Sequence, residues 1–380
     1  MELSRAQAEG YRSRVRGCLL GGAIGDALGA PVEFVALSRI RAEHGERGVR
    51  GYCADHTGGA PRFGLVTDDT QMTLFTVEGL AQAGIRRDRG LGFNPVGLLH
   101  RSYLTWYETQ TRAEPSGDRA GWLRRERWLY ARRAPGNTCL NALAAAAAPT
   151  GERQRYGAAA DNGSKGCGGV MRSAPIGLLP PWRGDHGPAI FSWAAEAAGL
   201  THGHPTGKLA SGALALLVHR LVAGDGLSGA LDGVMSELAR HDGHEETSEA
   251  LSAARAAAES SPVCAETVER LGGGWIAEEA LAIAVYAALV HDGPTPDAFL
   301  DALALAVTHS GDSDSTGAVC GNILGALHGE STLPPELAFE VEGRGTILQL
   351  ADDFVWEFTA PDRLHGEYGP FTRWTDRYRG

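Results

Sequence analysis

GCLLGGAIGDALG, residues 17–29, places glycine at Gly17, Gly21, Gly25 and Gly29, a strict spacing of four. On an α-helix, residues four apart lie one above the other, so these glycines form a row without side chains. Each glycine in a helix interior costs roughly 1 kcal/mol relative to alanine. The row therefore indicates either a second backbone packed very closely against this helix, or a ligand that reaches the helix backbone.

The same segment contains one carboxylate, Asp26, between Gly25 and Ala27. A carboxylate in an apolar stretch needs hydrogen-bond partners when it is buried. Two roles are open for Asp26: it caps a neighbouring loop, or it supports a functional site.

Helical periodicity dominates the rest of the chain. Apolar residues recur at spacings of three and four, alanine and leucine are abundant, and alternating strand patterns are scarce. We expect helices at residues 15–30, 70–83, 95–107, 138–147, 190–200, 208–222, 227–238, 279–290, 298–307, 318–327 and 346–358. No linker or break in composition divides the chain. The sequence therefore predicts an all-α fold and one compact domain over residues 1–380, with a C-terminal tail, residues 359–380, wrapped around it.

The composition excludes several classes of protein. The 380 residues include 43% apolar and 21% charged residues, which is a globular balance. With 35 Lys and Arg against 46 Asp and Glu, the net charge of −11 disfavours a protein held on nucleic acid by phosphate contacts. The six cysteines form no CxxC pair, and the longest apolar run, residues 280–290, is too short to span a membrane. We expect a cytoplasmic protein with reduced thiols and no membrane partner.

Two acidic clusters stand at the starts of expected helices: VTDDTQM at residues 66–72 and SGDSDSTG at residues 310–317. Asp, Ser and Thr are preferred N-cap residues, and one of them would satisfy each helix. Adjacent carboxylates exceed that need, and without nearby cysteine or histidine they favour Mg²⁺, Mn²⁺ or Ca²⁺ over zinc. Whether the two clusters meet does not follow from their spacing, so capping and metal binding both remain open.

Two further segments have the composition of ligand loops. NGSKGCGGVMR, residues 162–172, is a glycine-rich turn whose backbone amides could cradle a phosphate, with Lys165 adding charge. An ordinary flexible loop fits this segment equally well. LTHGHP, residues 200–205, ends one expected helix and begins another, and His202 and His204 taken alone favour capping or polar core positions.

Together and in this order, these segments resemble the ADP-ribosylglycohydrolase family. The matching stretches are GCLLGGAIGDALGAPVEF at residues 17–34, VTDDTQM, NGSKGCGGVMR, LTHGHPTG and SGDSDSTGAVCGNILGA at residues 310–326. The resemblance covers residues 14–358. It implies a compact, orthogonal all-helical fold and a hydrolase that cleaves the glycosidic bond between ADP-ribose and an acceptor. It also implies a centre of two Mg²⁺ ions, or Mn²⁺ ions, that orients the ribose and activates water.

The resemblance assigns roles residue by residue. The implied metal ligands are Thr67, Asp68, Asp69, Asp312, Asp314 and Ser315. The implied substrate-binding residues are Glu33, Ser164, Lys165, Gly166, Cys167, Gly168 and His202. Catalytic roles fall to Glu33, over the metals and beside the leaving group, and to Asp69 or Asp314 as the base. At Lys165 and Cys167 some relatives carry Tyr and Asn, so the phosphate and ribose contacts differ here.

The acceptor is not readable from the sequence. Arginine, serine, another side chain, a nucleic-acid base and O-acetyl-ADP-ribose all fit, and nucleic acid is a partner only if it carries the ADP-ribosyl group. We expect acceptor specificity in residues 45–64 and in the Arg- and Trp-rich residues 112–134. The alternatives are a non-catalytic ADP-ribose-binding or structural protein of the same fold, and a metal-dependent nucleotide phosphoesterase.

Overall fold

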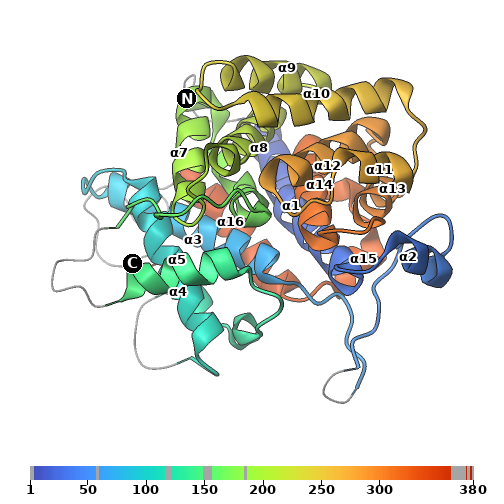
Figure 1. The fold of residues 1–380 in the computed structure, drawn as a ribbon. Coiled ribbons are helices and arrows are strands. Elements are labelled where there is room, and N and C mark those ends of the chain that lie inside the picture. Colours follow the sequence, from blue (N-terminus) through green and yellow to red (C-terminus); the bar gives the residue numbers. More distant parts are fainter. Residues whose placement is uncertain are drawn as a thin grey trace.

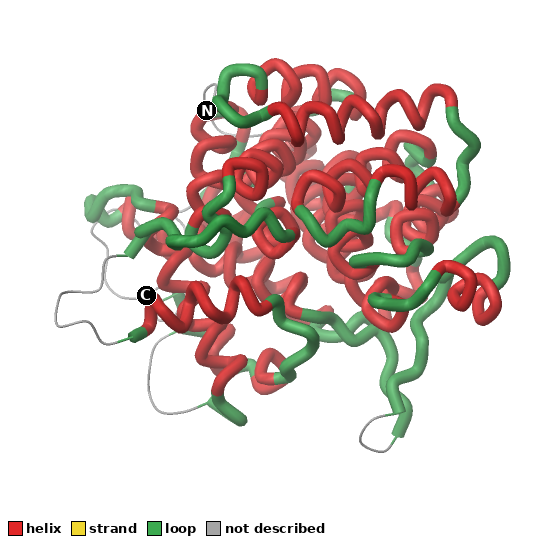
Figure 2. The backbone as a smooth tube through the Cα atoms, viewed as in Figure 1, coloured by secondary structure: helices red, strands yellow, loops and turns green. Residues whose placement is uncertain are grey.

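The described part of the chain consists of helices joined by loops. The computed structural model describes residues 4–56, 60–115, 121–148, 156–183, 186–360, 374 and 377–378. Figure 2 shows helices and loops and no strand in these residues, and two isolated β-bridges are the sole sheet-like pairings among them. The all-α prediction is confirmed. Most of the predicted tail, residues 361–373, lies outside the described residues, so its wrapping stays a prediction.

Short turns and several longer loops join the helices (Figure 1). The α-helices are α1 (Arg5–Gly29), α2 (Leu37–His44), α3 (Asp68–Asp88), α4 (Pro95–Thr111), α5 (Asn137–Ala147), α6 (Ala174–Gly177), α7 (Gly187–Gly199), α8 (Pro205–Ala223), α9 (Leu227–Leu238), α10 (Glu245–Ser260), α11 (Ala265–Leu271), α12 (Ala277–Val290), α13 (Pro296–Val307), α14 (Ser313–His328), α15 (Pro335–Glu340) and α16 (Arg344–Thr359). The 3₁₀ turns are η1 (Ala30–Val32), η2 (Leu123–Arg125), η3 (Arg127–Tyr130), η4 (Cys167–Arg172), η5 (Pro181–Arg183) and η6 (Glu330–Thr332).

The centre of the fold is the contact between α1 and α14, which run antiparallel with their backbones touching. The glycine row of α1 faces a second glycine row on α14, and the pairs are Gly17 with Gly325, Gly21 with Gly321, and Gly25 with Gly317. A Cβ atom added at Gly321 would lie 2.0 Å from the carbonyl oxygen of Gly21. Of the two explanations for the row in α1, close helix packing is confirmed.

One polar side chain sets the register of this contact. Asn322 Nδ2 donates to the carbonyl of Cys18 at 2.8 Å. The space for its amide exists because residue 22 is glycine: a Cβ atom there would lie 2.1 Å from Asn322 Nδ2. A hydrogen bond buried between two helices fixes their relative position, because sliding would leave its donor and acceptor unpaired.

The remaining helices surround this pair (Figure 1). Helix α12 packs against α14, α8 and α10 and buries most of its surface, whereas α3 and α16 pack against the other side of α1. All the helices expected from periodicity are present. Helices α2, α6, α10, α11 and α15 were not predicted. Helix α10 buries only Thr247, Leu251 and Ala254, so its apolar period is weak.

No single helix in the described ranges is long and apolar enough to cross a membrane. One bent pair, Arg5–Val32 with Leu37–His44, reaches the required length and composition, with an angle of 104° between its parts.

The glycine contact predicts a strong position dependence of Gly→Ala substitution. Gly321→Ala should lower the free energy of unfolding by about 3 kcal/mol or more, because backbone atoms cannot move away from the new Cβ. Gly10→Ala, in an open part of α1 with no atom within 4 Å of the new Cβ, should instead be neutral or stabilise by up to about 1 kcal/mol. Denaturant unfolding of both variants measures the difference; equal effects would contradict the packing described.

Candidate metal and substrate site

The glycine contact between α1 and α14 places the carboxylate of Glu33 near the start of α14. It ends where Gly29 meets Ser313 at the start of α14, with 2.1 Å between an added Cβ and the Ser313 carbonyl oxygen. The chain then forms the short turn η1 and continues to Glu33. Carboxylate oxygens of Glu33, Asp312 and Asp314 all lie within 4.8 Å of one another. Glu33 precedes Asp312 by 279 positions in the sequence. The fold thus brings three predicted site residues together from distant parts of the chain.

Asp26 connects α1 to the first acidic cluster. Its carboxylate accepts hydrogen bonds from the backbone N–H of Thr67 at 3.0 Å and of Thr70 at 3.1 Å, and from the hydroxyls of both. Burial raises the pKa of Asp26 to about 6, and these hydrogen bonds oppose the rise. Asp26 therefore caps a neighbouring loop, which is one of the two roles left open by the sequence. Because this loop is the start of α3, Asp26 also supports the candidate site.

Capping explains some acidic and hydroxyl residues of the clusters but not all of them. Thr67 caps α3 by accepting from Asp69 N–H, and Asp312 caps α14 by accepting from Ser315 N–H at 3.3 Å. Asp68, Asp69 and Asp314 lie within the first turns, where helix N–H groups favour negative charge. The Ser315 side chain opposes the rise in the pKa of Asp69, so the two helix starts lie side by side.

The carboxylates of this site are crowded and shielded from water. Burial, followed by neighbouring carboxylates, holds the pKa values of Asp69 and Asp314 well above their usual range. Burial also raises the pKa of Asp68 to about 8, against the opposing hydrogen bond from Gly136 N–H. Burial, then Asp312 and Asp68, raises the pKa of Glu33 to about 8.

Positive charge from the protein does not relieve this crowding. Among the described residues, no lysine or arginine pairs with Asp68, Asp69, Asp312 or Asp314, and Asp69 Oδ1 is buried without a hydrogen-bond partner. An unpaired buried carboxylate oxygen is costly, and a hard divalent cation with oxygen ligands relieves that cost. The set of carboxylates and hydroxyls therefore fits a metal ion.

The glycine-rich loop is held rigidly beside these carboxylates. Asn162 Oδ1 accepts from the N–H groups of Ser164 and Gly203, both at 3.0 Å. Cys167 donates its N–H to the Trp275 carbonyl and its thiol to Asp312 Oδ2 at 2.8 Å. The loop is therefore ordered by its own side chains and is joined to the second acidic cluster through Cys167.

Lys165 is placed differently from a free phosphate-binding lysine. Its ammonium group pairs with Glu246 at 2.8 Å and with Glu278 at 2.7 Å. Hydrogen bonds to these carboxylates raise the pKa of Lys165. The charge of Lys165 is thus already compensated within the protein.

His202 lies under the loop as a neutral imidazole. It is 2% exposed, and its Nδ1 is 2.8 Å from Thr201 Oγ1. Burial, helped by Arg172, lowers the pKa of His202 to about 3. The ring closely faces the backbone of Gly168, whereas His204 caps α8 by accepting from Thr206 N–H. Core packing and capping, both favoured from sequence, are thus observed, and His202 also lies beside the loop.

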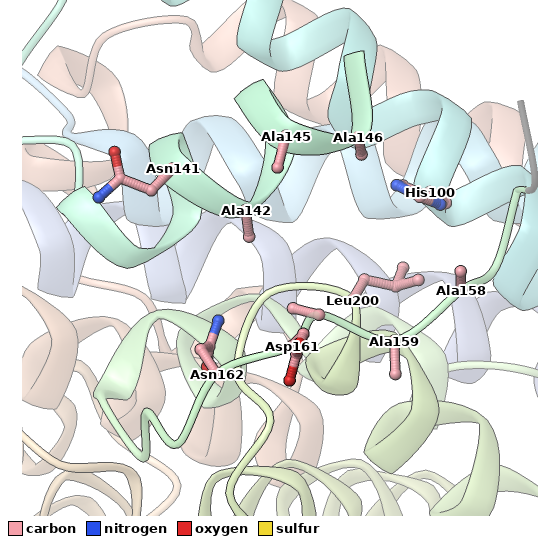
Figure 3. A pocket seen from close by; sticks show the side chains of 11 residues that line it. His100, Asn141, Ala142, Ala145, Ala146, Ala158, Ala159, Asp161, Asn162 and Leu200 are labelled. Atoms are coloured by element: carbon pink, nitrogen blue, oxygen red, sulfur yellow. The ribbon is translucent and has the colours of Figure 1, made fainter. Parts of the chain in front are cut away.

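A pocket extends from the loop along α5 and was not predicted from the sequence (Figure 3). Its volume is about 440 Å³. The lining is mainly alanine, with polar groups at its edges: His100, Asn141, Ala142, Ala145, Ala146, Ala158, Ala159, Ala160, Asp161, Asn162 and Leu200. His100 is 3% exposed, and its Nδ1 accepts from Gly157 N–H, so the hydrogen of the neutral ring is on Nε2, which has no partner. Sequence reasoning missed the pocket because single alanines give no signal.

The Arg- and Trp-rich segment is largely structural. Two 3₁₀ turns, η2 and η3, lie within residues 121–134, and Arg124 is buried against Glu108. Glu78 on α3 accepts the N–H groups of Trp122 and Leu123 at 3.0 and 3.1 Å. A role for this segment in acceptor choice stays a prediction.

Known proteins resemble this chain over most of its length. The profile of the ADP-ribosylglycohydrolase family matches residues 7–363. The ADP-ribosyl-[dinitrogen reductase] glycohydrolase of Rhodospirillum rubrum is 26% identical over 84% of this chain and 87% of its own. An uncharacterised protein of Archaeoglobus fulgidus is 28% identical over 82% of this chain and 87% of its own. A solved structure described as an ADP-ribosylglycohydrolase-related protein complex superposes with a TM-score of 0.64 and 26% identity, covering 92% of this chain and 99% of that one.

The raised pKa values predict that Mg²⁺ stabilises the protein more at about pH 8 than at about pH 5. Asp68 and Glu33 have pKa values of about 8 in the fold and roughly 4 when unfolded. Without a cation, their contribution to stability is complete below about pH 4 and is lost as the pH rises to about 8. A bound cation replaces those protons, so its effect grows with pH.

Thermal unfolding with Mg²⁺ and with EDTA at the two pH values measures this dependence. Asp232→Asn, on the surface of α9, is the control and should respond as the wild type does. An equal Mg²⁺ effect at both pH values, or an undiminished effect in Asp68→Asn, would be incompatible with a cation at these carboxylates.

Proposed function

The chain belongs to the ADP-ribosylglycohydrolase family, and we propose that it hydrolyses the glycosidic bond between ADP-ribose and an acceptor. The resemblance inferred from the sequence motifs is confirmed by the match over residues 7–363. The acceptor, the number and identity of the metal ions and the roles of individual residues are proposals that rest on the geometry of the site.

The observation that carries this proposal is the path along α5. Gly136, before its first turn, donates to Asp68 Oδ2 at 3.4 Å, and Thr138 Oγ1 lies 3.3 Å from Ser164 Oγ on the glycine-rich loop. Asn141, Ala142 and Ala145 then line the pocket. Positions 138, 141, 142 and 145 share one face of the helix, and Gly136 to Ala145 corresponds to about 13 Å of helix rise.

The order of the carboxylates, the N-terminus of α5 and the pocket matches the order of the chemical groups in ADP-ribose. Carboxylates suit a metal-bound ribose, and the N-terminus of α5 with the hydroxyls of Thr138 and Ser164 suits a diphosphate. The alanine-lined pocket suits the flat adenine ring. We place the distal ribose at the acidic cluster and the adenosine in the pocket.

The metal ligands would come from both helix starts. Thr67, Asp68 and Asp69 from the start of α3, and Asp312, Asp314 and Ser315 from the start of α14, would hold two Mg²⁺ ions, or Mn²⁺ ions. When bound, such ions orient the ribose hydroxyls and make water a better nucleophile at neutral pH.

The protein side chains supply proton transfer on the two sides of the anomeric carbon. Asp69, whose Oδ1 has no protein partner, accepts a proton from the attacking water. The water oxygen bonds to the anomeric carbon as the bond from that carbon to the acceptor breaks, through an oxocarbenium-like transition state. Glu33 gives its proton to the departing acceptor atom. Exchange with solvent then returns both carboxyl groups to their starting states.

Release of intact ADP-ribose tests the proposal. The wild type with Mg²⁺ should free ADP-ribose from ADP-ribosyl-arginine, from ADP-ribosyl-serine or from O-acetyl-ADP-ribose, and EDTA should abolish the activity. Asp314→Asn should lower turnover by about a hundredfold or more while leaving thermal unfolding cooperative. Mass spectrometry identifies the product.

Other products would point to the alternative functions. Phosphate or a mononucleotide would indicate a phosphoesterase. Tight binding of ADP-ribose with no cleavage of any of the linkages would indicate a binding protein. Full activity of Asp314→Asn would exclude the proposed metal centre, and Asp232→Asn, remote from the site, controls for the loss of a carboxylate.

If the adenosine lies in the pocket, a substitution there should change KM and leave kcat nearly unchanged. Ala142→Trp fills part of the pocket and should raise KM about tenfold or more with little change in kcat, because the substitution removes binding far from the reacting bond. Ala147→Trp, exposed on the same helix and outside the pocket lining, should leave both parameters unchanged. Inhibition by free ADP-ribose should weaken in parallel with KM; unaltered inhibition in Ala142→Trp would place the adenosine elsewhere.

A further inference from the structure

Two aromatic rings lie stacked and exposed beside the acidic cluster. The rings of Phe34 and Trp275 have centroids 4.8 Å apart and an interplanar angle of 28°. Phe34 is 72% exposed and Trp275 is 41% exposed, so neither belongs to the hydrophobic core. They come from distant parts of the chain, the turn after η1 and the loop between α11 and α12.

Phe34 is held in a conformation that its own backbone does not favour. Its φ angle is +63°, and it is one of two non-glycine residues with positive φ among the described residues. A bulky residue in this region is strained and persists only when surrounding contacts enforce the conformation. Phe34 N–H donates to the Gly311 carbonyl at 3.4 Å, which ties the strained residue to the segment that precedes Asp312.

Trp275 is fixed to the same segment. Asp312 N–H donates to the carbonyl of Gly273 at 2.8 Å, and the Trp275 carbonyl accepts from Cys167 N–H at 3.1 Å. The carboxylate of Glu279 accepts the N–H groups of Gly273 and Gly274. Both rings are therefore positioned by backbone contacts to the candidate site and not by packing against each other alone.

Phe34 directly follows the residue proposed to protonate the acceptor. Glu33, the proposed proton donor to the acceptor atom, immediately precedes Phe34 and lies within 4.8 Å of Asp312 and Asp314. The pocket assigned to adenosine is lined by α5 and residues 158–162, which are other parts of the chain. The aromatic pair is thus free to contact the acceptor when ADP-ribose is bound.

We propose that Phe34 and Trp275 bind the acceptor and select flat, cationic leaving groups such as a guanidinium over alkyl hydroxyls; this inference rests on the proposed function. A guanidinium stacks on an aromatic face and is attracted to the ring electrons. Carboxylates of Glu269 and Glu279 lie on the segments beside the rings and match its charge. The serine side chain offers neither a flat face nor a charge.

Two substrates that differ only in the acceptor test the selection. For ADP-ribosyl-arginine, Phe34→Ala and Trp275→Ala should each raise KM about five- to tenfold with kcat within about twofold, because stacking contributes to binding more than to the bond-breaking step. For ADP-ribosyl-serine, both parameters should stay within about twofold. The conservative variants Phe34→Tyr and Trp275→Phe should restore the arginine KM.

Controls and a binding measurement keep this inference separate from the proposed function. Phe339→Ala removes a ring that is 76% exposed on α15 and should change nothing. Calorimetry with agmatine, a free guanidinium compound, should show binding to the wild type that weakens at least about fivefold in Trp275→Ala.

Several outcomes would overturn the inference. These are equal losses with both substrates, no loss with the arginine substrate, cleavage of the serine linkage alone by the wild type, and agmatine binding that is absent or unaffected by Trp275→Ala. If the wild type cleaves neither linkage, the proposed function fails for these acceptors, and the agmatine measurement still decides the role of the two rings.

Discussion

The contact of one helix backbone with another, without side chains between them, determines where the functional residues lie. Helices α1 and α14 approach so closely that backbone oxygen atoms occupy the places where Cβ atoms would stand. This contact fixes the end of α1 against the start of α14 and so places Glu33 beside Asp312 and Asp314. Through Asp26 the same helix holds the start of α3. One helix thus positions all the parts of the acidic site.

The site combines two costs that oppose folding: buried carboxylates and their mutual repulsion. The fold meets part of this cost with helix N-termini, hydroxyl groups and the backbone N–H of Gly136. It supplies no arginine or lysine to Asp68, Asp69, Asp312 or Asp314 within the described ranges. A bound cation would supply the missing positive charge. Lys165, on the neighbouring glycine-rich loop, pairs instead with Glu246 and Glu278.

Local patterns made much of this structure predictable. Helical periodicity predicted most of the long helices. Both acidic clusters were predicted to lie at helix starts, and the structure places them at the starts of α3 and α14. The glycine row on α14, Gly317, Gly321 and Gly325, was equally visible in the sequence, but its pairing with α1 is a tertiary fact. The pocket along α5 and the stack of Phe34 on Trp275 arise where distant segments meet, and no periodicity encodes such meetings. Helix α10 was missed because it buries few large side chains.

The antiparallel contact also limits how the gene for such a protein can change. A helix turns by about 100° and rises about 1.5 Å with each residue. One residue inserted between Gly25 and Asp26 would rotate the carboxylate away from Thr67 and Thr70 while Gly17, Gly21 and Gly25 stayed against α14. The distance in sequence from Gly17 to Glu33 is therefore fixed by geometry. Insertions and deletions within this segment would separate Asp26 or Glu33 from the residues that they contact.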